Sequence, residues 1–159
     1  MKKAIPGLFI FAILFSYIGI LFSCNKTGDS DSKPPSNFTW TYNGSTYKAD
    51  LDSAYVHYDL TPYLIMAITG TNFNTFFTQK IYFSLASFNT GNFTIVPGPG
   101  SNILQYIDVS GYDHSGVSGT LSITSNANNL LSGNFSATIA GPSGNEPISG
   151  SFTNVPVKP

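Results

Sequence analysis

The sequence predicts an all-β domain, a single antiparallel β-sandwich or barrel-like fold of about nine to ten short strands over residues 38–159. Apolar side chains alternate with polar ones at a period of two, which places one face of a strand in a core. Clusters of Gly, Asn, Ser and Pro separate these runs and predict turns. No segment from Phe38 to Pro159 has the 3.6-residue periodicity of an amphipathic helix. Short strands with such turns are typical of sandwiches and barrels.

A β-hairpin opens the predicted domain in the segment FTWTYNGSTYKAD. Asn43-Gly44 separates two alternating runs, which indicates a two-residue type I′ turn. Such a turn fixes the register, and the expected pairs are Tyr42 with Ser45, Trp40 with Tyr47, and Phe38 with Ala49. Because cross-strand aromatic pairs stabilise a sheet, we expect this aromatic face to be buried.

Four further strands are expected in residues 54–58, 63–69, 80–87 and 102–109. The segment 63–69 is almost entirely apolar, as a central strand would be. In the segments 80–87 and 102–109, the alternating apolar side chains are expected to share one face: Ile81, Phe83 and Leu85, and then Ile103, Ile107 and Val109. The same alternation leaves Tyr82 and Tyr106 opposite these residues, exposed on a sheet face.

A short motif recurs, in which an apolar residue follows a glycine two positions later. Its four copies are Gly91-Asn92-Phe93-Thr94, Gly119-Thr120-Leu121-Ser122, Gly133-Asn134-Phe135-Ser136 and Gly150-Ser151-Phe152-Thr153. We interpret the glycine as a turn or bulge that opens a strand, and the apolar residue as pointing inward. The last strands are therefore expected around Leu121 and Ile123, around Leu131 to Ile139, and around Ile148 and Phe152.

Residues 1–23 have the pattern of a secretory signal, because Lys2 and Lys3 precede an apolar run from Ile5 to Phe22. As a helix this run would be about 27 Å long, so an uncleaved transmembrane anchor is an alternative. Leu21-Phe22-Ser23-Cys24 resembles a bacterial lipobox. The resemblance implies that the Cys24 sulfur takes a diacylglycerol and that the signal is cut before it. Cys24 is the only cysteine, so an internal disulfide is excluded.

Residues 24–37 are polar and contain Pro34-Pro35, a composition typical of a flexible, disordered tether. Asn25 is not the aspartate associated with retention in the inner membrane. We therefore expect a lipid-anchored protein of the bacterial outer membrane, on its periplasmic or its surface face.

Four motifs of the domain resemble a family of small Bacteroidota lipoproteins of unknown function. They are the hairpin Trp40–Ala49, the segments Gly91–Ile95 and Ser132–Phe135, and the closing segment Gly150–Val157, which has the pattern G-x-F-x-N-V-P-V. The resemblance implies a fold and a location, and it brings no reaction and no functional residues.

Charge excludes one class of partner. From residue 38 onward the chain carries three lysines, six acidic residues and no arginine. Nucleic-acid binding needs a basic surface, so we expect no nucleic-acid partner.

Few residues are suited to catalysis. His57 and His114 are the only histidines, and neither accompanies a G-x-S-x-G motif. His114 lies in GYDHSG, which indicates a turn, and the only glutamate, Glu146, lies in an expected loop. We therefore expect structural or solvated histidines, no cofactor and no enzyme. A glycan-directed hydrolase that uses aspartates or a bound metal is one alternative, and a structural subunit that assembles through strand edges is another.

Five side chains are candidates for minor sites. Asp50 and Asp52 are weak candidates for a calcium site, because they share a strand face. Ser53, in Asp52-Ser53-Ala54, resembles the O-glycan acceptor of Bacteroidota proteins. Exposed aromatic rings on a sheet face suit carbohydrate binding, which makes Tyr82 and Tyr106 candidates for ligand stacking. The expected function is a non-catalytic binding or assembly module whose partners are membrane lipid through Cys24 and a carbohydrate or envelope protein.

Overall fold

The computed structural model describes residues 34–50, 53–57, 63–68, 78–98 and 102–158, without the side chains of 63–68. Residues 34–159 form one compact unit. Its described part contains ten strands and no helix, which confirms the all-β prediction. They are β1 (Asn37–Tyr42), β2 (Ser45–Lys48), β3 (Ala54–His57), β4 (Tyr63–Ile68), β5 (Lys80–Leu85), β6 (Gly91–Ile95), β7 (Ile103–Ile107), β8 (Asp113–Ala127), β9 (Leu130–Gly141) and β10 (Gly144–Lys158).

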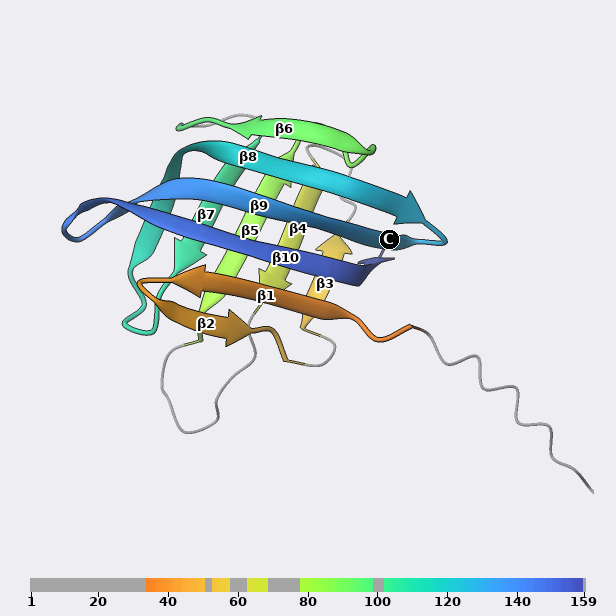
Figure 1. Ribbon diagram of the computed structural model, residues 1–159, viewed down its shortest axis with the longest axis horizontal. Coiled ribbons are helices and arrows are strands. Elements are labelled where there is room, and N and C mark those ends of the chain that lie inside the picture. The colour runs from red at the N-terminus through yellow and green to blue at the C-terminus, as the bar shows by residue number, and fades with distance from the viewer. Residues whose placement is uncertain (1–33, 51–52, 58–62, 69–77, 99–101, 159) are drawn as a thin grey trace, which may run out of the picture. The chain divides into compact units, whose positions relative to one another are not determined.

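The strands form two layers that share two long strands (Figure 1). One layer has the order β2-β1-β10-β9-β8-β6, and β3, β4, β5 and β7 form the other. The start of β8 pairs with β7, and the end of β10 pairs with β3, so the layers join at both corners. The β10–β3 pair is parallel, and the other pairs are antiparallel. The result is a closed ring of seven strands, with β1, β2 and β6 as extensions of one layer.

Irregularities in register allow the long strands to turn from one layer into the other. In β8 the register with β9 shifts between Gly116 and Ser118, next to Gly119 at a φ of 140°. In β10 it shifts between Phe152 and Val155, at Asn154 with a φ of 53°. An extra residue bends a strand and increases its twist, which is how a sheet closes at a corner.

The predicted hairpin is confirmed. Asn43 and Gly44 have φ values of 48° and 74°, as a type I′ turn requires. Trp40 pairs with Tyr47, and Tyr42 pairs with Ser45. Phe38, Trp40 and Tyr42 are all buried, so the aromatic face does face the core.

The prediction of which face of β7 is buried is wrong. Leu104 and Tyr106 are buried, whereas Ile103 and Ile107 are half-buried and Val109 is 54% exposed. Leu104 lies opposite Phe83, and Tyr106 lies opposite Ile81, in the antiparallel pair of β5 and β7. Directly opposed residues share a face, so the buried face of β5 decides which face of β7 is buried.

The glycines of the repeated motif have two different structural roles. Gly91 and Gly119 have φ values of 147° and 140°, at a strand start and next to a bulge, as we interpreted them. Gly133 and Gly150 instead lie within strands, in register with Phe152 and Phe135. Each of these rings lies over the glycine opposite, where a Cβ atom would come within 2.7 Å of a ring carbon. These two glycines leave space for the phenylalanine of the neighbouring strand.

Candidate functional site

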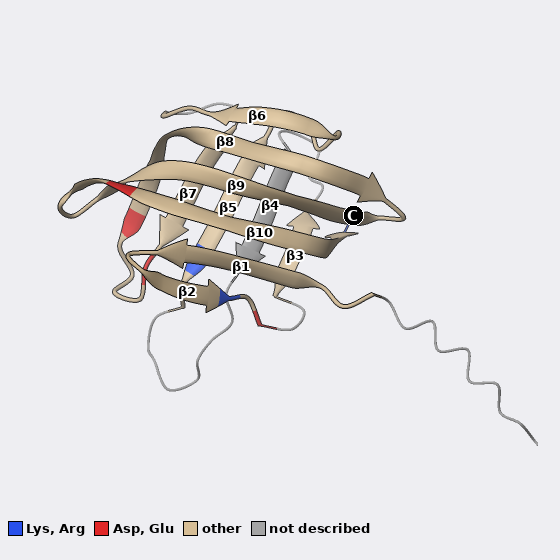
Figure 2. Cartoon of the chain, in the orientation of Figure 1, with Lys and Arg blue, Asp and Glu red and all other residues tan. Residues whose placement is uncertain are grey.

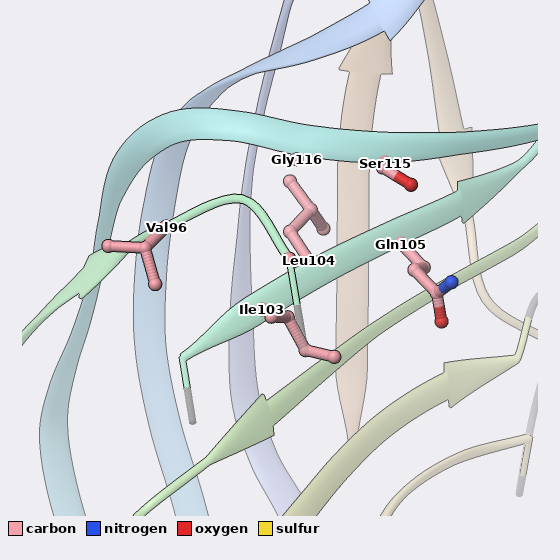
Figure 3. Close-up of a pocket in the computed structure, with 7 residues that line it drawn as sticks. Val96, Ile103, Leu104, Gln105, Ser115 and Gly116 are labelled. Atoms are coloured by element: carbon pink, nitrogen blue, oxygen red, sulfur yellow. The ribbon is translucent and has the colours of Figure 1, made fainter. Parts of the chain in front are cut away.

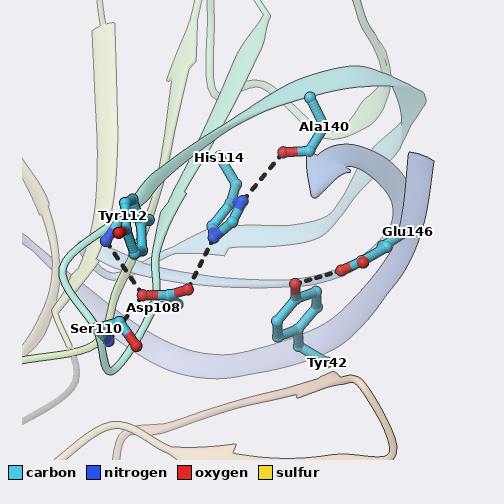
Figure 4. Close-up of polar contacts among 7 residues, drawn as sticks. All are labelled: Tyr42, Asp108, Ser110, Tyr112, His114, Ala140 and Glu146. Atoms are coloured by element: carbon cyan, nitrogen blue, oxygen red, sulfur yellow. Dashed lines mark hydrogen bonds and ion pairs between the residues drawn. The ribbon is translucent and has the colours of Figure 1, made fainter. Parts of the chain in front are cut away.

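A buried polar network lies where β7 turns into β8, and His114 is at its centre (Figure 4). His114 is the second residue of β8 and is only 5% exposed, so the prediction of a turn at this residue is wrong. Its Nδ1 lies 3.0 Å from the carbonyl oxygen of Ala140, and its Nε2 lies 3.0 Å from Oδ2 of Asp108. Both ring nitrogens therefore face acceptors.

Asp108 organises the turn that precedes His114. Its Oδ1 accepts hydrogen bonds from the backbone N–H groups of Ser110 and Tyr112, at 2.8 and 3.1 Å. The backbone of Asp108 also donates to the Tyr112 carbonyl and accepts from the Gly111 N–H. Four hydrogen bonds of Asp108 thus lie within this turn, and they hold the tight connection from β7 to β8.

The network favours a charged His114–Asp108 pair. Burial alone would lower the pKa of His114, but its hydrogen bonds to Asp108 and Ala140 and the charges of Asp108 and Glu146 outweigh burial and raise the pKa. Burial alone would raise the pKa of Asp108, but hydrogen bonds from His114, Ser110 and Tyr112 lower it. In the protonated form of His114, Nδ1 donates to a carbonyl that can only accept, and Nε2 donates to the carboxylate.

Two aromatic rings lie beside the His114 imidazole. The Tyr106 ring stacks on His114 with a centroid distance of 5.8 Å, and Tyr42 lies 6.1 Å away. Tyr106 itself is fully buried, so it cannot stack on an external ligand and the prediction of an exposed Tyr106 is wrong. Its ring instead stacks on His114, an arrangement that favours the protonated form of the imidazole.

Glu146 completes the network from β10. It lies in that strand, opposite Ile139, and not in the loop expected from the sequence. Its carboxylate accepts a hydrogen bond from the Tyr42 hydroxyl, and it lies over Gly141, where a Cβ atom would collide with it. Burial first, and then the hydrogen bond and charge of Glu146, raise the pKa of Tyr42 to about 12.

This network is suited to holding strands together more than to transferring protons. A general base needs a nitrogen lone pair within reach of a substrate. Both nitrogens of His114 are instead bonded inside the domain. Sequence reasoning missed the network because Tyr42 and Glu146 are 104 residues apart. Only the short spacing of Asp108 and His114 around Gly111 was a local signal.

A second group of polar side chains lies on the outer face of β5, β7 and β8. Tyr82, Gln105 and Ser115 are opposite one another across these three strands. Tyr82 is half-buried, and burial, followed by the charge of Asp113, raises its pKa. The Gln105 amide donates to Asp113 Oδ2 at 3.2 Å. An aromatic ring, an amide, a hydroxyl and a carboxylate are thus grouped on one surface.

A shallow hollow of about 200 Å³ adjoins this group, where β8 leaves β7 and joins β6. Gln105 and Ser115 line it together with the apolar residues Val96, Ile103 and Leu104 (Figure 3). Gly116 forms part of its wall. The hollow therefore combines apolar walls with polar groups, as small-molecule sites do.

The other predicted site residues that the structure describes belong to neither group. Asp50 is exposed, and Ser53 is half-buried with its Oγ donating to the Asp50 carbonyl at 2.7 Å. Asp52 and Cys24 lie outside the described residues. His57 is half-buried in β3. Within the described ranges no group of three or more His, Cys, Asp or Glu side chains could hold a metal ion.

Among the residues described, no helix has the length and apolar character needed to cross a membrane. Comparison with known proteins adds no relative. No model of a protein family matches this chain, and no curated protein or solved structure matches it significantly.

Proposed function

We propose that this protein is a non-catalytic binding module, attached to the bacterial outer membrane through a lipidated Cys24, and that its ligand is a carbohydrate. The location rests on the lipobox-like sequence before Cys24 and the polar tether after it. The ligand class rests on the outer face of β5, β7 and β8.

The main support for a carbohydrate ligand is the position of Tyr82 beside Gln105, Ser115 and Asp113. A sugar ring presents an apolar C–H face and a rim of hydroxyl groups. An aromatic ring in a sheet offers a flat apolar surface, and a carboxylate and an amide accept and donate hydrogen bonds at its edge. The hydrogen bond from Gln105 to Asp113 orients the amide in advance, which reduces the entropy lost on binding.

The buried network supports this surface from behind. Asp113 directly precedes His114 at the start of β8. The Asp108–His114 pair fixes the turn that comes before these two residues. The acidic segments at the start of β8 and in β10 gather at the same end of the domain (Figure 2). Asp108 and His114 thus stabilise the turn, and the proposed binding surface consists of Tyr82 and its neighbours.

The test is binding of bacterial envelope polysaccharide fragments to the wild-type chain and to Tyr82→Ala. We expect Tyr82→Ala to weaken binding about tenfold, because loss of a stacked ring costs about 1.4 kcal/mol. Tyr55→Ala is the matched control: Tyr55 is also half-buried, but it lies in β3 with Lys158 Nζ 4.7 Å from its ring centroid. Equal losses in both variants, or none in Tyr82→Ala, would contradict the proposal.

The same samples test the hydrolase alternative. The fragments are incubated with the chain and analysed for shortened products. Cleavage that Asp113→Asn abolishes while the fold is retained would replace the binding module with an enzyme at this surface.

A further inference from the structure

Among the described strands, β6 is an edge of the larger layer, and its composition is unusual for an edge. In the described part of the chain β6 pairs with β8 on one side only. Its sequence, GNFTI, has no charge and no proline. Indeed, no charged residue lies between Lys80 and Asp108. In Figure 2, β6 is tan along its whole length, the colour of uncharged residues.

Edge strands are usually protected against pairing by lysine, proline or shortness. The other edge of this layer follows that rule, because β2 has four residues and ends at the exposed Lys48. In β6 such protection is absent over five residues, and the exposed Val96 follows directly. The structure thus shields one edge and leaves the other suited to pairing.

We propose that β6 pairs antiparallel with the β6 strand of a second copy of this chain, about a two-fold axis at Phe93. This register sets Phe93 opposite its counterpart and Asn92 opposite Thr94 of the other copy. It also sets Gly91 opposite Ile95. Each uncharged residue then meets an uncharged one, and the two layers join into one continuous sheet.

The burial pattern of β6 fits a second copy as the occupant. Phe93 packs on the core but is only half-buried, although its register partner Leu121 is fully buried. A second Phe93 on the same face would cover the remaining ring surface, and cross-strand aromatic pairs are favourable. Asn92 and Thr94 are exposed on the opposite face, where amide and hydroxyl groups meet in the proposed register.

The first test is analytical ultracentrifugation of the full chain in detergent, with micelles in large excess over protein. We expect self-association with a Kd on the order of 100 μM, as is usual for a small contact. Thr94→Lys should weaken it at least about tenfold, because lysine protects an edge. Thr46→Lys is the matched control, an exposed threonine of β2, and it should change the Kd less than about twofold.

The second test reads the register by cysteine cross-linking. Residues directly opposite in an antiparallel pair have Cα atoms about 4.5–5.5 Å apart, within the reach of a disulfide. A mixture of Asn92→Cys and Thr94→Cys chains should therefore form disulfide-linked mixed dimers faster than either variant alone. The parent chain, whose only cysteine is Cys24, gives the background.

Three outcomes would overturn the proposal: a chain that stays monomeric up to the highest concentration, a dimer that Thr46→Lys dissociates and Thr94→Lys does not, or cross-links that form equally in all mixtures. Thermal unfolding of each variant confirms that a lost dimer is not a lost fold.

Discussion

Replacing His114 with alanine removes the charged partner of Asp108 and the donor that satisfies the Ala140 carbonyl. The side chains of His114 and Asp108 are 6% and 18% exposed, so the pair is largely removed from water. Removing one partner of a buried pair costs about 3–5 kcal/mol. Because Asp108 retains some contact with solvent and two backbone donors, we expect the lower end, a loss of about 3 kcal/mol in the free energy of unfolding.

The loss of stability in His114→Ala should depend on pH, and the directions of the two pKa shifts determine the pH range in which it is largest. The pKa of His114 is raised in the folded state, so its contribution is complete below the unfolded value of about 6.5 and is lost as the pH rises through the folded value. The pKa of Asp108 is lowered, so its contribution is complete above about 3.9 and is lost as the pH falls through the folded value. The difference between wild type and variant is therefore largest between about pH 4 and 6.5.

The assay is urea unfolding of wild type, His114→Ala and His57→Ala across this pH range and above it. His57 is half-buried in β3, and its replacement should cost less than about 1 kcal/mol at every pH. Asp108→Asn is a milder variant, because its amide oxygen can still accept from Ser110 and Tyr112. It should be destabilising near pH 5.5 and much less so near pH 9. A His114→Ala effect that is constant from about pH 5 to 9 would refute the charged pair.

Three other predictions follow from the sequence and the fold. Cys24→Ser should abolish incorporation of labelled palmitate and leave the precursor uncleaved; a wild-type chain that carries no lipid would instead indicate a transmembrane anchor. The pKa of Tyr42 is raised to about 12, so its contribution to stability is complete below about pH 10 and is lost as the pH rises through 12. Tyr42→Phe should therefore leave the phenolate absorbance of the folded protein unchanged up to about pH 11, and a smaller signal in the variant would contradict this pKa. Gly150→Ala should cost about 3 kcal/mol in thermal unfolding, because its Cβ would lie 2.3 Å from a backbone oxygen of β1. Ser149→Ala, an exposed neighbour, should cost less than about 0.5 kcal/mol, and equal losses would show that the close approach is not the cause.

Features that depend on neighbouring residues were predictable from the sequence. The alternation of apolar residues placed Ile81, Phe83 and Leu85 in the core, and Asn43-Gly44 set both the turn type and the register of the first hairpin. Both are local, because a period of two follows from the pleat of one strand, and a two-residue loop leaves only one way to pair its flanks. The all-β class follows from the same signals repeated along the chain.

Other features depend on the pairing of segments that lie far apart in the sequence. The register with β5 buried Tyr106 and turned Ile103 and Ile107 away from the core, although the alternation in β7 fits either face. Gly133 and Gly150 need the rings of Phe152 and Phe135 above them, which no local pattern reveals. The polar network required β1, β8, β9 and β10 to meet at one end of the domain. Its side chains come from segments that a one-dimensional pattern cannot bring together, because the long-range register that joins them is a property of the closed sheet and not of any single strand.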